Sequence, residues 1–316
     1  MEKRPLGRSG LTVPPVCFGG NVFGWTLDRR ESFAMLDRAL DAGLNYVDSA
    51  DVYSFWVPGN QGGESESLIG EWMAERGVRQ KMVVATKVGM DKAAGKPNLK
   101  PAYIRECVEA SLKRLRTDYI DLYYAHRDDQ TLPMADVLGE FGDLVQEGKV
   151  RSLGASNFTA ERLTEAVNVR AQHGGGRYDV LQNEYNLYVR DVEQNGVSAA
   201  CGRHGVVQCP FYALGSGFLS GKYRSAEDAG KSPRGEAVVK KFVNARGLAI
   251  LAAMDEVSGQ TGASLSRIAI AWLIRKPTVA SAIASATSQD QFDDLVAAAT
   301  LDLSPAQMQA LDDAGA

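Results

Sequence analysis

The chain has 316 residues, of which 23% are charged and 45% apolar, so its composition is that of a globular protein and excludes a disordered one. Its 35 basic and 39 acidic side chains give a net charge of −4 without a basic run, which excludes a nucleic-acid-binding protein. No apolar run approaches the roughly 18 residues that span a bilayer. The first residues also lack an apolar signal core, so we expect no membrane partner and a cytoplasmic location.

Strand and helix patterns alternate along the chain after a short opening hairpin at residues 4–13. Short apolar runs predict strands at 16–18, 44–48, 82–87, 120–126, 150–156, 180–184, 206–212 and 280–284. Apolar residues at helical spacing predict helices at 28–42 with Asp28 as N-cap, at 65–76, from Pro101 onward, at 134–147, 160–172, 191–203, 239–259, 264–275 and 288–299, and one that starts at Ser304-Pro305. A polar segment at 222–238 interrupts the alternation.

Strands that are apolar on both faces are typical of a parallel sheet covered by helices. Eight strand-helix units in 316 residues therefore predict an α/β protein: a single (β/α)8 TIM barrel over residues 1–316, with an N-terminal β-hairpin and extra C-terminal helices. A doubly wound open sheet is the alternative. Its glycine fingerprint is missing, because Gly19-Gly20-Asn-Val-Phe-Gly24 has a different spacing.

The four cysteines show no metal-binding or redox spacing. We expect Cys17, Cys107, Cys201 and Cys209 to be small hydrophobic side chains in a reducing compartment, and we expect no metal site.

Polar residues stand at the ends of three consecutive predicted strands. Asp48, Lys87 and His126 end the strands at 44–48, 82–87 and 120–126, and Tyr53 follows Asp48 in the next loop. In a barrel this end of the strands carries the active site. Each residue alone has an ordinary structural explanation, such as a helix cap, a solvated lysine, a structural histidine or a packed tyrosine. Together, the four chemically complementary groups predict a catalytic site.

These side chains fit proton transfer to a carbonyl oxygen. A buried lysine beside a tyrosine favours the phenolate, so we expect Lys87 to lower the pKa of Tyr53, with Asp48 orienting the lysine. Tyr53 then acts as general acid or base, and His126 donates a hydrogen bond to the same oxygen. Because the sequence shows no nucleophile or metal cluster, this chemistry points to hydride transfer from a cofactor.

The sequence resembles the aldo-keto reductase superfamily over nearly its whole length. The motifs that carry the resemblance are Asp48-Ser-Ala-Asp-Val-Tyr53, Ala85-Thr-Lys87-Val-Gly, Tyr124-Ala-His126-Arg-Asp-Asp, Gly154-Ala-Ser156-Asn157-Phe, Leu181-Gln182-Asn-Glu-Tyr-Asn186 and the segment from Pro210 to Tyr223. The resemblance implies a (β/α)8 barrel that binds a nicotinamide cofactor, usually NADPH, across the ends of the strands. It also implies that Asp48, Tyr53, Lys87 and His126 are the catalytic residues.

The same resemblance implies how the cofactor is held. Ser156, Asn157 and Gln182 would hold the nicotinamide carboxamide, and Phe211 would stack on the ring, with Tyr212 as the alternative. A loop would wrap the pyrophosphate through Leu214, Ser216, Gly217, Leu219, Gly221 and Lys222. The adenosine end would meet Ser285, Thr287, Ser288, Gln291 and Asp294.

The sequence departs from the family pattern at this adenosine end. Ser285, Thr287 and Gln291 stand where the family often has lysine or arginine, and Leu295 replaces the usual asparagine. Fewer cations weaken recognition of the NADP 2′-phosphate, although Lys222 or Arg234 can supply charge from the wrapping loop. We therefore expect NADP(H) with a relaxed preference, and NAD(H) as an alternative.

The expected substrate is a small carbonyl compound or alcohol. Trp25, Phe55, Trp56 and Arg127 are the predicted pocket residues. Phe55 and Trp56 can equally cover the barrel rim, and Arg127 can equally pair with Asp128 or Asp129 on the surface.

We expect an NADP-dependent carbonyl reductase or alcohol dehydrogenase that is a monomer or a small homo-oligomer. The alternative is a cofactor-sensing regulatory subunit with weak or vestigial activity.

Overall fold

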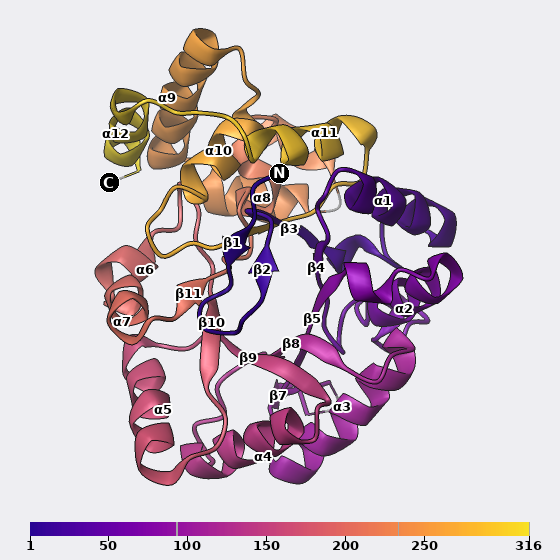
Figure 1. Cartoon of the computed structure of the whole chain (residues 1–316). Coiled ribbons are helices and arrows are strands. Elements are labelled where there is room, and N and C mark those ends of the chain that lie inside the picture. Colours follow the sequence, from indigo (N-terminus) through magenta and orange to yellow (C-terminus); the bar gives the residue numbers. More distant parts are fainter. Residues whose placement is uncertain (93, 233, 316) are drawn as a thin grey trace.

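The computed structural model describes residues 1–92, 94–232 and 234–315 and shows a ring of strands surrounded by helices (Figure 1). Residue 233 of the polar segment and residue 316 of the expected domain lie outside the described residues. The largest sheet has eight parallel strands. In spatial order they are β11 (Val207–Gln208), β10 (Tyr178–Gln182), β9 (Val150–Ser156), β8 (Ile120–Ala125), β5 (Val83–Val88), β4 (Tyr46–Asp48), β3 (Val16–Gly19) and β12 (Ala282–Ala284).

Backbone hydrogen bonds close this sheet into a barrel. The N–H of Gln208 in β11 donates to the carbonyl oxygen of Thr278 at 2.7 Å, and the N–H of Ala280 donates back to Gln208 at 2.9 Å. These bonds join β11, at one edge of the sheet, to the segment that leads into β12, at the other edge, so neither edge is left open. The predicted (β/α)8 barrel is therefore confirmed.

The opening hairpin, β1 (Arg4–Pro5) and β2 (Thr12–Val13), closes the N-terminal end of the barrel. Its apolar side chains Leu6, Leu11 and Val13 join the buried cluster of inward-facing strand residues that includes Tyr46 and Leu122. Burial of this interior stabilises the barrel by about 25 cal/mol for each Å² of apolar surface removed from water. With this end filled, the opposite end is free to form a site.

Helices surround the ring on its outer side (Figure 1). They are α1 (Arg29–Asp41), α2 (Glu64–Arg76), α3 (Pro101–Leu115), α4 (Met134–Gln146), α5 (Ala160–His173), α6 (Asp191–Gln194), α7 (Val197–His204), α8 (Gly235–Phe242), α9 (Ala245–Thr261), α10 (Leu265–Leu273), α11 (Gln289–Ala298) and α12 (Pro305–Ala314). Short 3-10 helices lie at η1 (Gly20–Val22), η2 (Arg79–Lys81), η3 (Gly215–Ser220) and η4 (Ala226–Lys231), and β6 (Met90–Asp91) pairs with β7 (Lys96–Pro97).

The helix starts follow local capping chemistry. The Asp28 carboxylate accepts a hydrogen bond from the N–H of Glu31, whose side chain accepts from the N–H of Asp28, so the predicted cap of α1 is confirmed. Pro101 and Pro305 occupy first-turn positions, where a missing N–H costs little.

Three predicted boundaries are wrong. The helix predicted at 191–203 is two helices, because Gly196 between them takes φ +83°, a left-handed conformation that ends a helix. The helix predicted at 239–259 is α8 and α9, since the Asn244 side chain accepts from the N–H of Gly247 and starts a new helix. The strand predicted at 206–212 is a regular strand only over Val207–Gln208, and an isolated bridge between Phe211 and Glu184 follows it.

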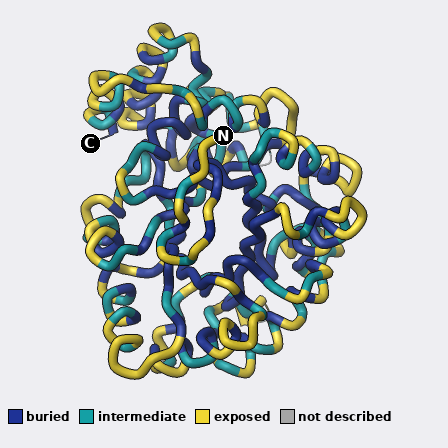
Figure 2. Tube along the Cα trace, viewed as in Figure 1, coloured by how far each residue is buried: buried dark blue, intermediate teal, exposed yellow. Residues whose placement is uncertain are grey.

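Burial follows the ring. Figure 2 shows dark blue buried segments along the strands and yellow exposed segments mainly on the outer helices and loops. Among the described residues, no helix combines the length and the apolarity needed to cross a membrane.

Candidate functional site

Five neighbouring strands bring polar side chains to the same edge of the barrel. Asp48, Ser156 and Gln182 are the last residues of β4, β9 and β10, Lys87 is the penultimate residue of β5, and His126 directly follows β8. Because these strands are parallel and adjacent, their carboxyl ends meet. The structure thus brings together residues that are up to 134 positions apart.

Lys87 is the centre of a compact hydrogen-bond network. Its fully buried ammonium donates to Asp48 Oδ2 at 2.6 Å, to the carbonyl oxygen of Ser49 at 2.6 Å and to the Tyr53 hydroxyl oxygen at 2.9 Å. The Tyr53 hydroxyl in turn donates to Asp48 Oδ2 at 3.2 Å. All three donors of the lysine are used, which fixes its position.

The expected lowering of the Tyr53 pKa is wrong for this structure. Burial raises the pKa of Tyr53 well above its ordinary value, and the Asp48 carboxylate raises it further through its charge and its hydrogen bond. The Asp48 carboxylate accepts a hydrogen bond from the same hydroxyl and disfavours its ionisation, although a lysine lies beside it. Tyr53 is therefore a neutral phenol, the form that can donate a proton.

His126 is neutral as well. Burial lowers the pKa of this imidazole well below its usual range, and the nearby cations Lys87 and Arg127 lower it further. Its ring centroid lies 6.4 Å from that of Tyr53. Nδ1 of His126 is buried and has no hydrogen-bond partner among the described residues.

Ser156, Asn157 and Gln182 form an uncharged cluster beside this network. Ser156 Oγ donates to the carbonyl oxygen of Gln182 at 2.8 Å, and the Asn157 amide donates to Ser156 Oγ and to the carbonyl oxygen of His126, each at 3.0 Å. The Gln182 amide donates to Asp48 Oδ1 at 2.9 Å. Asn157 takes φ +59°, a conformation that asparagine tolerates better than most residues.

A second buried hydrogen-bond network involves Ser49, whose carbonyl oxygen accepts from Lys87, and it was not predicted from the sequence. Ser49 Oγ donates to Ser65 Oγ at 2.9 Å, and Ser65 Oγ donates to the carbonyl oxygen of Gly20 at 2.8 Å. This network links the first turn of α2 to the loop that holds the Ser49 carbonyl against Lys87. Small hydroxyl residues with no charge gave no signal at the sequence level.

The polar network lies in the wall of a cavity of about 1040 Å³. Most of the predicted site residues line it: Trp25, Asp48, Tyr53, Trp56, His126, Arg127, Ser156, Asn157, Gln182, Phe211, Leu214, Ser216, Gly217, Lys222, Ser285, Thr287 and Gln291. Lys87 does not line the cavity itself but donates to Asp48 and Tyr53, which do. The cavity therefore runs from the Tyr53 hydroxyl to the start of α11.

Some predicted residues do not line the cavity, and each is engaged elsewhere. Phe55 packs its ring on the edge of Trp56 with 48% of its surface exposed, and Leu219 is buried in the hydrophobic core. Ser288 caps α11, and Asp294 pairs with Arg267 at 2.7 Å. Gly221 ends η3. Phe55 was predicted in the substrate pocket, and the resemblance implied that the other four are near the cofactor, but neither showed which way each side chain faces.

The cavity wall also contains residues that were not predicted, including Asn21, Met90, Glu184, Ser232 and Ser266. Asn21 follows the end of β3, and its side-chain oxygen lies 2.7 Å from Ser285 Oγ. As a polar residue after an apolar strand, it carried the same signal as Asp48. Ser266 lies at the start of α10, where no strand end marks it.

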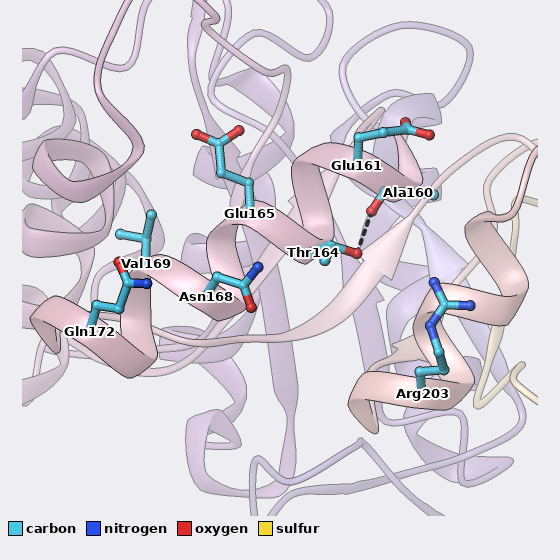
Figure 3. Close-up of a pocket in the computed structure, with 8 residues that line it drawn as sticks. All are labelled: Ala160, Glu161, Thr164, Glu165, Asn168, Val169, Gln172 and Arg203. Carbon is cyan, nitrogen blue, oxygen red and sulfur yellow. Dashed lines mark hydrogen bonds between the residues drawn. The ribbon is translucent and has the colours of Figure 1, made fainter.

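A second, shallower hollow of about 590 Å³ lies on the outer surface between α5 and α7. Its lining residues Thr164, Glu165, Asn168 and Arg203 are among those labelled in Figure 3, where Thr164 donates to the carbonyl oxygen of Ala160. It shares no lining residue with the larger cavity.

Known proteins resemble this chain over most of its length. The model of the aldo/keto reductase family matches residues 15–316. The chain is 31% identical to an uncharacterized oxidoreductase, YrpG, of Bacillus subtilis, over 99% of this chain and 95% of that protein. It is 32% identical to an aryl-alcohol dehydrogenase (NADP(+)) of Phanerodontia chrysosporium, over 96% and 83% of the two chains. It is also 31% identical to a probable voltage-gated potassium channel subunit beta of Oryza sativa subsp. japonica, over 92% and 89%.

Proposed function

The chain belongs to the aldo/keto reductase family of oxidoreductases, and from this membership and the geometry of the cavity we propose that it is an NADP(H)-dependent reductase of small aldehydes or ketones, or a dehydrogenase of the matching alcohols. The observation that carries the proposal is the Tyr53 hydroxyl in the cavity wall, within 2.9 Å of the Lys87 ammonium. A neutral phenol next to a fixed cation is a proton donor whose anion is stabilised as it forms.

The cavity fits a nicotinamide dinucleotide by the chemistry of its wall. Near Tyr53 it offers the uncharged amide and hydroxyl groups of Ser156, Asn157 and Gln182, which suit a carboxamide. Lys222 and Arg234 also line the cavity, and within the described residues neither forms an ion pair. The Arg234 guanidinium lies over the Trp25 ring, 4.5 Å from its centroid. Phe211, half-buried, would stack on the ring, while Tyr212 stands exposed beside it with ring centroids 5.1 Å apart.

In the proposed reduction, the residues handle the oxygen of the carbonyl group. A bound nicotinamide cofactor supplies the hydride that the carbonyl carbon accepts. Tyr53 donates its proton to the carbonyl oxygen, and Lys87 at 2.9 Å stabilises the phenolate that remains. Neutral His126 donates a hydrogen bond to the same oxygen and orients it. Asp48 holds the lysine in place, and Tyr53 regains a proton from solvent after the product leaves.

The experiment that tests this proposal separates binding from turnover. NADPH is first titrated into the protein while tryptophan fluorescence is recorded, and aromatic aldehydes, aliphatic aldehydes and ketones are then added singly while NADPH absorbance is followed. We expect binding and turnover of at least one carbonyl class. Failure to bind NADPH would contradict the cofactor assignment.

The similarity to a potassium channel subunit beta supports a second candidate function, a cofactor-sensing regulatory subunit. The same experiment distinguishes the two. Tight NADPH binding without turnover of any carbonyl in the panel would favour the regulatory subunit over the enzyme.

A further inference from the structure

Arg127 is a cation at the cavity that the proposed reaction does not use. It directly follows His126 and lines the same cavity as Tyr53, with its side chain exposed toward solvent. Arg127, His126 and Tyr53 all line this cavity, so the arginine belongs to the wall that also contains the reacting groups.

The carboxylates next to Arg127 in the sequence are engaged elsewhere. Asp128 accepts two hydrogen bonds from Arg162, at 2.7 Å and 2.8 Å. Asp129 accepts from the N–H groups of Leu99 and Thr131 and from the Thr131 hydroxyl. Within the described residues, neither of these acids forms an ion pair with Arg127.

The acids of the cavity wall are also paired with other cations. Asp48 pairs with Lys87 at 2.6 Å, and Glu184 pairs with Lys241 at 3.1 Å. The cavity therefore keeps an excess of positive charge in a chain whose net charge is −4. Lys222 and Arg234 serve the cofactor in the proposed function, which leaves Arg127 for another anion.

Aromatic side chains line the same cavity as Arg127. Trp56 contacts Tyr53 and Trp25 edge to face, with ring centroids 6.2 Å and 5.5 Å apart. Trp56 is 41% exposed and Tyr212 is 46% exposed, and both line the cavity. A flat apolar ligand that binds in this cavity can bury its surface against these exposed rings and so remove it from water.

We propose that the substrate is an aromatic carbonyl compound with an anionic group, and that Arg127 binds this group while Trp25 and Trp56 contact the ring. The proposal rests on the proposed function, since it names the substrate class of that same site. A planar guanidinium binds a carboxylate through two parallel hydrogen bonds, which both anchors and orients the substrate.

The test compares two aldehydes that differ in one charge, 4-carboxybenzaldehyde and methyl 4-formylbenzoate. In the wild type we expect the lower KM for the carboxylate. Arg127→Gln should raise that KM about tenfold and leave kcat and the ester kinetics within about twofold, because only the anion loses its partner. Arg127→Lys should retain part of the preference. Added salt should raise the KM of the carboxylate alone.

Arg203→Gln is the matched control, since Arg203 lies at the outer hollow between α5 and α7 (Figure 3). Arg203→Gln should leave KM and kcat unchanged for both aldehydes. An equal rise in KM for both aldehydes in Arg127→Gln would overturn the proposal, because the arginine would then not recognise the anionic group. A raised dissociation constant for NADPH would also overturn it and would give Arg127 a role in binding the cofactor.

A binding measurement keeps this inference separate from the proposed function. Tryptophan fluorescence reports the dissociation constant of 4-(hydroxymethyl)benzoate without any reaction. We expect about tenfold weaker binding in Arg127→Gln. If neither aldehyde is reduced but this difference is found, the proposed function fails and the anion site stands. If the aldehydes are reduced and the difference is absent, the anion site fails alone.

Discussion

Asp48 has two roles at the level of single side chains. Its Oδ2 accepts hydrogen bonds from Lys87 and Tyr53, while its Oδ1 accepts from Gln182, so one carboxylate joins the proton donor to the predicted carboxamide site. This explains why the tyrosine stays protonated although a lysine lies beside it. The residue types at the strand ends were enough to predict the four groups, but the balance between lysine and carboxylate depends on distances that the sequence does not contain.

The carboxylate of Asp51, in the loop that follows β4, makes the free energy of unfolding depend on pH. Burial raises the pKa of Asp51 to about 8, the neighbouring Glu66 carboxylate raises it as well, and Arg114, Lys92 and Lys87 act in the opposite direction. The folded chain therefore keeps a proton on Asp51 over a range in which the unfolded chain, with an ordinary pKa near 3.9, has lost it. Stability must fall as the pH rises through that range, by up to about 1.4 kcal/mol per pH unit.

Asp51→Asn removes this titration while keeping the shape of the side chain. We expect urea unfolding at about pH 5.5 and about pH 7.5 to show the wild type losing stability relative to the variant at the higher pH. Asp143→Asn, at an exposed position of α4, is the control and should show no such trend. An unchanged difference between wild type and Asp51→Asn at the two pH values would contradict the raised pKa.

At the level of elements, the packing of α2 on α3 depends on one small residue. A Cβ on Gly70 would lie 2.2 Å from the carbonyl oxygen of Arg114 and 2.5 Å from the carbonyl carbon of Leu115, which are backbone atoms that cannot rotate away. Gly70→Ala should therefore separate the two helices and cost about 3 kcal/mol or more. Gly139→Ala in α4 is the matched control.

Thermal or urea unfolding of the two variants measures this difference. A Cβ on Gly139 meets no atom within 4 Å, so alanine should be neutral or stabilise α4 by up to about 1 kcal/mol. Similar effects of the two substitutions would show that α2 does not pack on α3 as described.

The order of the elements was predictable from the sequence, whereas several of their ends were not. Apolar runs and helical spacing located the strands and the surrounding helices, because burial on the inner and outer layers leaves a clear pattern. Gly196 and Asn244 each separate two helices without changing the apolar spacing around them, so the spacing predicted one continuous helix in each case. Val207–Gln208 is a short strand because its regular pairing with β10 covers only these two residues, and Pro210 shortly after them has no N–H to donate.

For the whole molecule, the charge balance determines how a phosphate-bearing cofactor can be held. With a net charge of −4 there is no general positive field, so the proposed cofactor binding would depend on local groups such as Lys222 and Arg234. The Arg234 guanidinium lies over the Trp25 ring, 4.5 Å from its centroid, which brings the polar segment against the loop after β3. The sequence predicted the shortage of cations at Ser285, Thr287 and Gln291, and all three line the cavity.

This shortage leads to a prediction about cofactor preference. We expect kcat/KM with NADPH to exceed that with NADH by less than about a thousandfold, because Ser285, Thr287 and Gln291 cannot give the 2′-phosphate the charge-assisted hydrogen bonds of a lysine or arginine, which are worth about 1.5–3 kcal/mol each. Gln291→Arg should improve kcat/KM for NADPH about tenfold or more and leave NADH nearly unchanged. A larger wild-type preference, or an equal gain for both cofactors, would contradict this account of the adenosine end.

In the proposed carbonyl reduction Tyr53 supplies the proton, and Tyr53→Phe tests this role. Phenylalanine keeps the ring contact with Trp56 and removes only the hydroxyl that lies 2.9 Å from the Lys87 ammonium. With a carbonyl substrate found in the panel, we predict that kcat falls about 10²- to 10⁴-fold while the dissociation constant of NADPH changes by less than about threefold. A variant that retains near-wild-type kcat would contradict the proposed role of Tyr53 and with it the proposed mechanism.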